Sequence, residues 1–434
     1  MNRAAPRPRA PGLFTVLDLG RDQLRRPVHY FDRLGDTFGV TLLGTRMLAT
    51  RDPAVFEDVL VRQHKLFSKD RITQKLSILL GQGLLTSEGP AWRKHRRLIQ
   101  PHLQPAELAR YLPVFRDEAE RLLETWPVHG TVELHAAMAQ TSMRIALRTL
   151  FGADAKGVDD FESSMRAVMM FFTGVAGTAV PLPLWLPTPT NRRFLRARAH
   201  LNDALHQILV RARDRGPTTS VLQNLLSAQD GGELSEQQLV DEGLTLLLAG
   251  HETSALALTY TLALLATDPE RQKAVHEELG NQPLDTLDSL RRSSGLSRAL
   301  KESMRLYPEA WALGREALED CEVAGMDVRR GTQIFLYQWA AHRHPRYFDA
   351  PDSFFPERWT PEFEASLPRV LYAPFGAGPR VCVGSHFAWA EVLCVLGALL
   401  RRTRFEAPPP FAPRFIPSIT LRPRDPVHAR ILRI

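Results

Sequence analysis

The ten-residue stretch at 375–384, Phe-Gly-Ala-Gly-Pro-Arg-Val-Cys-Val-Gly, constrains this chain more than any other feature. It places Cys382 in a loop with three glycines, whose missing Cβ atoms let the backbone approach a planar ligand closely. Only the thiolate is a good metal ligand, and Arg380 together with loop N–H groups turned toward the sulfur favours that ionised form. From about Val383 the sequence is apolar and helix-forming, so the dipole of a helix N-terminus also favours negative charge there. The stretch therefore predicts an axial thiolate on a metal.

The pattern Phe-x-x-Gly-x-Arg-x-Cys-x-Gly resembles the haem-thiolate motif of the cytochrome P450 family, and every fixed position is filled. The resemblance implies that Cys382 is the fifth iron ligand of haem b, whose thiolate pushes electron density that favours O–O cleavage. It also implies that Phe375, Gly376 and Arg380 contact the cofactor. An inert buried thiol is the alternative interpretation for an isolated cysteine.

The chain has 434 residues, of which 44% are hydrophobic, enough for a sizeable core. By the resemblance we expect one cytochrome P450 domain over 1–434, mainly α with small β-sheets (α+β), with a long central helix over the haem and the cysteine loop beneath it. Residues 1–35 would form an extended lead-in with one short helix. Residues 36–70 and 311–434 would contribute the β-rich part, and 89–306 the helical body.

Three cysteines, an odd number, suggest no disulfide framework and favour a reducing, cytoplasmic compartment. Met1–Pro11 has the features of neither a signal peptide nor a membrane anchor, and no run of 18 apolar residues predicts a transmembrane helix. In this respect the chain resembles the soluble, bacterial-type members of the family.

The net charge is +7, with one dense basic cluster at 93–97. Because no nucleic-acid module accompanies this cluster, a basic face for an acidic protein partner is expected.

Apolar residues at three- and four-residue spacing predict helices over 105–126, 133–151, 159–173, 191–215, 235–267 and 383–401. Short strands are expected at 40–43, 47–50, 322–324, 326–328 and 332–337, and irregular chain at 345–374. The apolar, Pro- and Gly-rich stretch 174–190 has two interpretations. It forms a lid over an apolar pocket, which we favour, or a corner that touches a membrane.

The helix predicted over 235–267 carries Ala-Gly-His-Glu-Thr at 249–253. A glycine inside a helix lowers helix stability by about 1 kcal/mol relative to alanine, so a specific role is expected for Gly250. The Thr253 hydroxyl can bond back to the carbonyl of residue 249 or 250 and open the helix slightly. By resemblance, Ala249 and Gly250 contact the haem, while Glu252 and Thr253 are the catalytic acid and alcohol that pass protons to bound dioxygen. A packed core helix with a satisfied threonine is the alternative. His251 is expected to face away from the iron.

Trp92 and Arg96 lie four residues apart on a predicted helix and share a face that suits a carboxylate. By resemblance they bind a haem propionate, as do Arg315 and Arg380, although a solvated basic face is the ordinary alternative. The family also implies a buried structural network of Glu302, Arg305 and Arg358 that holds the cysteine loop.

The resemblance predicts a haem-thiolate monooxygenase that hydroxylates or epoxidises a lipophilic small molecule, such as a fatty acid, terpenoid, steroid or polyketide-like product. Besides O2, it would need electrons from a separate ferredoxin or flavodoxin and its NAD(P)H reductase, docked on the basic face. A monomer that binds no nucleic acid is expected.

Two alternatives remain open, a peroxide-using relative (a peroxygenase or a hydroperoxide-rearranging enzyme) and a non-catalytic haem sensor or electron carrier. The substrate itself is not predicted. By resemblance, largely aliphatic stretches would line its pocket: 70–86, 165–190, the face around Leu246 and Ala249, 310–313 and 416–420.

Overall fold

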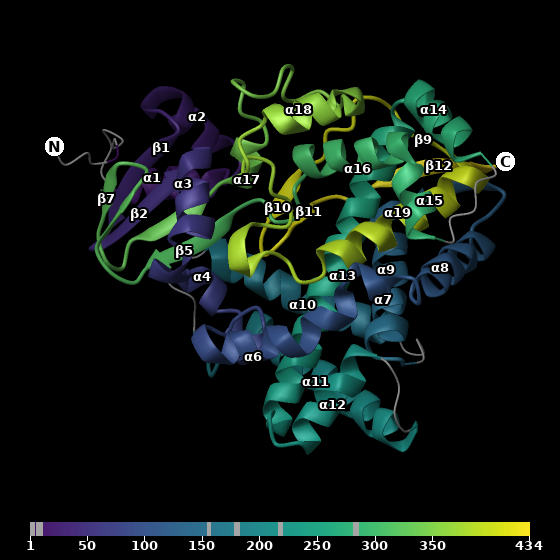
Figure 1. Cartoon of the computed structure of the whole chain (residues 1–434), viewed down its shortest axis with the longest axis horizontal. Helices are drawn as coiled ribbons and strands as arrows, with labels where there is room; N and C mark the ends of the chain where they lie inside the picture. Colours follow the sequence, from purple (N-terminus) through teal and green to yellow (C-terminus); the bar gives the residue numbers. More distant parts are fainter. Residues whose placement is uncertain (1–4, 6–11, 154–157, 178–182, 216–219, 281–285) are drawn as a thin grey trace. The chain divides into compact units, whose positions relative to one another are not determined.

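The computed structural model describes residue 5 and residues 12–153, 158–177, 183–215, 220–280 and 286–434 (Figure 1). The chain divides into two compact units. The first comprises Met1–Leu76 and Met304–Cys382, and the second comprises Ser77–Ser303 and Val383–Ile434. The single domain expected over 1–434 stays a prediction.

The first unit is built on a five-stranded sheet with the order β1-β2-β8-β5-β3. Its strands are β1 (Thr37–Leu42), β2 (Thr45–Thr50), β3 (Phe67–Lys69), β5 (Leu313–Ala317) and β8 (Gln333–Leu336). The pair β2–β8 is parallel and the other three pairs are antiparallel. A separate hairpin joins β6 (Cys321–Val323) to β7 (Met326–Val328). The strands predicted from the sequence are confirmed, with shifts of a few residues at their ends.

Two helices, α1 (Gly12–Arg21) and α2 (Arg25–Leu34), precede the first strand, so the prediction of one short helix in the lead-in was wrong. The second helix forms because its apolar side packs on the sheet, where the rings of Phe31 and Phe38 lie 5.1 Å apart. The next helix, α3 (Pro53–Glu57), starts at an Asp-Pro pair, with Asp52 accepting from the Ala54 N–H and Pro53 at the first helical position.

The prediction of irregular chain over 345–374 was also partly wrong, because α18 (Pro361–Ser366) lies within it. Thr360 caps this helix and Pro361 occupies its first position, a start signal that the Pro-rich surroundings obscured. The remaining helices of the first unit are α4 (Arg71–Gln74) and α17 (Gln338–Ala341).

The second unit is largely helical, as the periodicity predicted. Its helices are α5 (Ser77–Leu80), α6 (Gly89–Ile99), α7 (Pro105–Leu108), α8 (Leu112–Thr125), α9 (Leu134–Leu150), α10 (Val158–Gly177), α11 (Pro189–Arg215), α12 (Val221–Asp230), α13 (Glu236–Ala266), α14 (Pro269–Leu279), α15 (Leu287–Arg292) and α19 (Ser385–Arg402). The segment predicted as one helix over 105–126 is two helices. The chain of α16 (Ser294–Leu306) continues into the first unit.

The second unit also has two small sheets. One has the strand order β4-β12-β9, and the other is the hairpin β10-β11. Their strands are β4 (His129–Glu133), β9 (Thr403–Glu406), β10 (Phe415–Pro417), β11 (Leu421–Pro423) and β12 (His428–Arg433). Among the described residues, no helix has the length and apolar content that crossing a bilayer requires.

Helix α13 is the central element of the second unit and packs against α9 and α19 (Figure 1). It begins with a capping box, in which the side chains of Ser235 and Gln238 each accept from the other's backbone N–H. Its other end is tied to the β10-β11 hairpin, because the Tyr260 hydroxyl donates to the Leu421 carbonyl over 2.5 Å. Nearly every residue from Leu239 to Ala266 is buried, and the exceptions are Ala249, Gly250 and Thr253.

Candidate active site

The cysteine loop presents Cys382 as an exposed thiol at the end of the first unit. The Cys382 N–H donates to the Phe375 carbonyl over 2.9 Å and closes the loop. Gly376 and Gly378 have φ of 72° and 67°, in the left-handed region that disfavours a side chain. A Cβ on Gly378 would also lie 1.9 Å from the Leu60 carbonyl oxygen. The backbone conformation therefore favours glycine at both positions, and packing requires it at Gly378 as well. Helix α19 begins three residues after the thiol, as predicted.

Two buried arginines organise the irregular chain that precedes this loop. Arg305 donates to the carbonyls of His342, Pro351 and Ser353 over 2.9, 2.6 and 3.2 Å. Arg358 donates to the Asp349 carbonyl over 2.8 Å. Together they satisfy carbonyls of the chain between His342 and Ser353. The expected network with Glu302 that holds the cysteine loop stays a prediction. Glu302 is fully buried at the same end of α16.

A cluster of three cations lies in the first unit, formed by Lys69, Arg315 and Arg380. Burial, followed by the charges of Arg315 and Arg380, holds the pKa of Lys69 well below its usual range. Burial also lowers the pKa of each arginine to about 10. Asp70 is a buried carboxylate whose charge opposes these shifts at Lys69 and Arg315. Three cations and one carboxylate leave an excess of positive charge, which favours an anionic partner. The sequence predicted the two arginines but missed Lys69, which enters the cluster only through the pairing of β3 with β5.

Helix α6 of the second unit holds Trp92 and Arg96 on one face, as predicted. The Arg96 guanidinium carbon lies 5.7 Å from the centre of the Trp92 ring. Its Nε donates to Gln100 Oε1 over 2.9 Å. Arg93 and Arg97 are exposed on the same helix, and Arg97 pairs with Glu233, with Nη2 2.7 Å from Oε2.

The middle of α13 contains the only accessible positions between Leu239 and Ala266, a range that the structure describes in full. Ala249 is exposed, while Gly250 and Thr253 are half-buried. The Thr253 hydroxyl donates to the Ala249 carbonyl over 2.8 Å, which confirms the predicted back-bond. These three small or polar positions therefore form an accessible segment on an otherwise buried helix.

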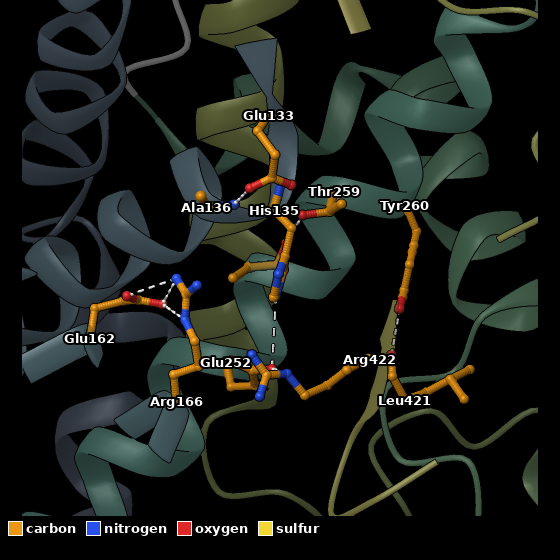
Figure 2. Close-up of polar contacts among 11 residues, drawn as sticks. Glu133, His135, Ala136, Glu162, Arg166, Glu252, Thr259, Tyr260, Leu421 and Arg422 are labelled. Atoms are coloured by element: carbon orange, nitrogen blue, oxygen red, sulfur yellow. Dashed lines mark hydrogen bonds and ion pairs between the residues drawn. The ribbon is translucent and has the colours of Figure 1, made fainter. Parts of the chain in front are cut away.

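The carboxylate of Glu252 is buried in a polar cluster of the second unit (Figure 2). Arg422 of β11 pairs with it, with Nε 2.8 Å from Oε1. His135 of α9 places its Nε2 3.8 Å from the same oxygen. Glu162 and Arg166 of α10 form a neighbouring ion pair of 2.8 Å. No local sequence signal pointed to Arg422, because only the packing of the hairpin against α13 brings it to Glu252.

The charges in this cluster have opposing effects on its titratable groups. Burial raises the pKa of Glu252, and the Arg422 charge counteracts that shift. Burial lowers the pKa of His251 to about 3, and the Arg422 charge adds to the effect. His135 has a pKa lowered to about 3 as well, by burial first and then by the charge of Arg422. Both imidazoles are therefore neutral at physiological pH, and Arg422 is the cation that faces the Glu252 carboxylate.

The comparisons with known proteins agree with one another. The family model described as cytochrome P450 matches residues 5–427. The chain belongs to the cytochrome P450 family. Cyclooctatin synthase of Streptomyces melanosporofaciens is 31% identical over 96% of this chain and 92% of that protein. Cyclooctat-9-en-7-ol 5-monooxygenase of the same organism is 32% identical over 92% of this chain and 90% of that protein.

A solved structure confirms the expected fold. The chain superimposes on the haem domain of cytochrome P450DA with a TM-score of 0.88 and 23% identity, covering all of this chain and 98% of that one. The mainly helical architecture with small sheets is therefore the P450 fold. As a P450 monooxygenase, the protein uses a haem-iron cofactor, O2, a redox partner and a lipophilic substrate.

The side chains of this P450 suit a haem group. An exposed thiol in a glycine-rich loop matches the requirement for an axial sulfur. The three-cation cluster matches the negative charge of carboxylate substituents. The roles of the individual residues stay predictions.

Proposed function

We propose that this P450 binds haem b and oxidises a lipophilic small molecule of the terpenoid class, by hydroxylation or epoxidation. The exposed Cys382 thiol in its glycine loop is the observation that carries the haem proposal. The names of two bacterial relatives support the substrate class, one for its action on cyclooctat-9-en-7-ol and another as pentalenene oxygenase. A separate ferredoxin or flavodoxin with an NAD(P)H reductase would donate electrons at the basic face of α6. The expected enzyme is a cytoplasmic monomer.

In this proposal Cys382 is the iron ligand, and Phe375 and Gly376 contact the cofactor from its loop. Lys69, Arg315 and Arg380 hold a propionate, and Trp92 and Arg96 hold the other. When bound, the haem iron supplies the activation of O2. The small residues Ala249 and Gly250 keep side chains out of the space beside α13, so that the cofactor and a small ligand fit there.

Thr253 and Glu252 are the proposed proton carriers. The Thr253 hydroxyl is half-buried on the accessible segment of α13 and can pass on a proton from its oxygen. Glu252 is buried beside it in sequence, and its raised pKa suits a group that holds a proton nearer to neutral pH. Arg422 keeps the carboxylate within the cluster in Figure 2, so proton delivery requires Glu252 to exchange partners.

The test is to reduce the haem-loaded protein under carbon monoxide. A red-shifted thiolate Soret band, together with product formation in the presence of a reconstituted ferredoxin system, is the expected result. Absence of this band would overturn the haem-thiolate proposal. Faster turnover with hydrogen peroxide than with the ferredoxin system would instead favour a peroxygenase.

Thr253→Ala should uncouple oxygen consumption from product formation. A positioned proton donor contributes roughly 10²–10⁴-fold, so product per NAD(P)H oxidised should fall by about 10²-fold while oxygen uptake continues. The measurement compares NAD(P)H consumption with product yield. Thr253→Ser keeps the hydroxyl and should retain most of the coupling. Equal yields from the alanine and wild-type proteins would contradict the assignment.

Arg422→Gln should shift the pH dependence of coupling upward. The substitution removes the charge that opposes burial, so the pKa of Glu252 rises further and the acid keeps its proton to higher pH. The alkaline limb of product yield against pH should therefore move to higher pH. Arg422→Lys keeps the positive charge and should leave the profile near that of the wild type. An unchanged profile in the glutamine variant would exclude this control of Glu252 by Arg422.

A further inference from the structure

The turn that precedes α11 holds a tryptophan out in solvent. Trp185 is 80% exposed, although it belongs to a turn with defined hydrogen bonds. The Leu186 N–H donates to the Pro183 carbonyl over 3.1 Å. The buried Asn191 then donates through Nδ2 to the carbonyls of Pro183 and Leu186, both over 2.9 Å. The exposure of Trp185 is therefore a property of an ordered turn that is fastened to the start of the helix.

The first turns of α11 have one buried face and one basic face. Phe194 is fully buried and stacks on Phe171 of α10, with ring centres 4.1 Å apart. On the opposite side, Arg192, Leu195 and Arg196 are exposed at the three- and four-residue spacing of a single helix face. Leu195 is 41% exposed between the two arginines. The outer face thus combines apolar and cationic side chains beside the tryptophan turn.

No acidic residue interrupts this region, since the sequence from Ser163 to Asn202 contains neither aspartate nor glutamate. Arg193 is exposed as well, which adds a third positive charge near the turn. A surface of this kind complements a partner that is negative and has an apolar layer directly behind the charge. Tryptophan is enriched at the membrane–water interface, and arginines near an anionic leaflet are attracted to its headgroups.

We propose that Trp185, Leu195, Arg192, Arg193 and Arg196 form a docking surface for anionic lipid membranes. Trp185 and Leu195 would enter the headgroup region while the arginines bind lipid phosphates. Unlike the proposed oxidation, this contact does not depend on the haem. If the substrate proposal also holds, membrane contact would bring the enzyme to the phase in which a lipophilic substrate collects.

The test measures co-sedimentation of the full-length holoprotein with vesicles of phosphatidylcholine alone and of phosphatidylcholine mixed with phosphatidylglycerol. We expect binding to the mixed vesicles and weak binding to phosphatidylcholine. Arg192→Glu/Arg196→Glu should weaken binding to the mixed vesicles by about tenfold or more, since each basic residue near such a surface contributes severalfold. Trp185→Ala should weaken binding to the same vesicles severalfold.

Arg211→Glu/Arg213→Glu is the matched control, because it changes the net charge equally on exposed positions of the same helix, about 25 Å away. This control should bind vesicles like the wild type. Equal loss in both double variants would mean that overall charge causes the attraction, which would overturn the proposal. It would also be overturned if the wild-type protein did not bind the mixed vesicles. A normal carbon monoxide spectrum in every variant would separate any of these outcomes from failure of the haem proposal.

Discussion

Cys382→Ser is expected to abolish monooxygenase turnover and the red-shifted carbon monoxide band while leaving the fold intact. The alcohol does not supply the thiolate that favours O–O cleavage, and the loop conformation depends on the glycines and on the Cys382 N–H rather than on the sulfur. Product formation should fall below detection, and far-UV circular dichroism should match that of the wild-type protein.

Cys321→Ser is the matched control for this experiment. Cys321 is a half-buried strand residue of the β6-β7 hairpin and has no role in the proposed site. Its serine variant should keep both the spectrum and the turnover. Continued turnover in the Cys382 variant would remove the basis of the proposed mechanism.

Glu242→Ala is expected to destabilise the second unit by about 3–5 kcal/mol, because it removes the carboxylate that pairs with the buried His95 side chain. The Glu242 carboxylate of α13 lies 2.7 Å from His95 Nδ1 of α6, and both side chains have no exposed area. The free energy of unfolding, from denaturant titration followed by circular dichroism, measures the effect. Glu242→Gln keeps a hydrogen-bonding group and should cost less than the alanine substitution.

An exposed ion pair provides the comparison. Glu120 lies 3.3 Å from Arg402, with both side chains about half exposed, so Glu120→Ala should change stability by less than about 1 kcal/mol. Similar losses in the Glu242 and Glu120 variants would show that burial of the His95–Glu242 pair has no special importance. A large loss should also weaken cofactor retention, because α6 carries the proposed propionate-binding residues Trp92 and Arg96 beside His95.

Several elements could be predicted because their causes are local. The capping box of α13, the Asp52-Pro53 start of α3 and the back-bond from Thr253 to Ala249 each involve residues within four positions of one another. Such contacts form wherever the backbone is helical, so the sequence contains all the information that they need. The left-handed backbone conformation of Gly376 and Gly378 was predictable for the same reason, because it depends on the residue type at each position.

The secondary-structure predictions were wrong where weak local sequence signals compete with tertiary packing. Helix α2 exists because Phe31 packs on the sheet strand that carries Phe38, and α18 was hidden among prolines that suggested irregular chain. In both regions the local propensity alone did not decide the conformation, and contacts with the rest of the first unit did.

By itself, the sequence determined the family, the thiol loop and the long helix with its glycine and threonine, because each of these is a short motif of neighbouring residues. Only the tertiary structure decided which charges meet. Lys69 joins Arg315 and Arg380, Arg422 pairs with Glu252, and His95 pairs with Glu242 through contacts between residues far apart in the chain. The physical reason is that burial and Coulomb interaction depend on distance in space, which local sequence patterns do not specify.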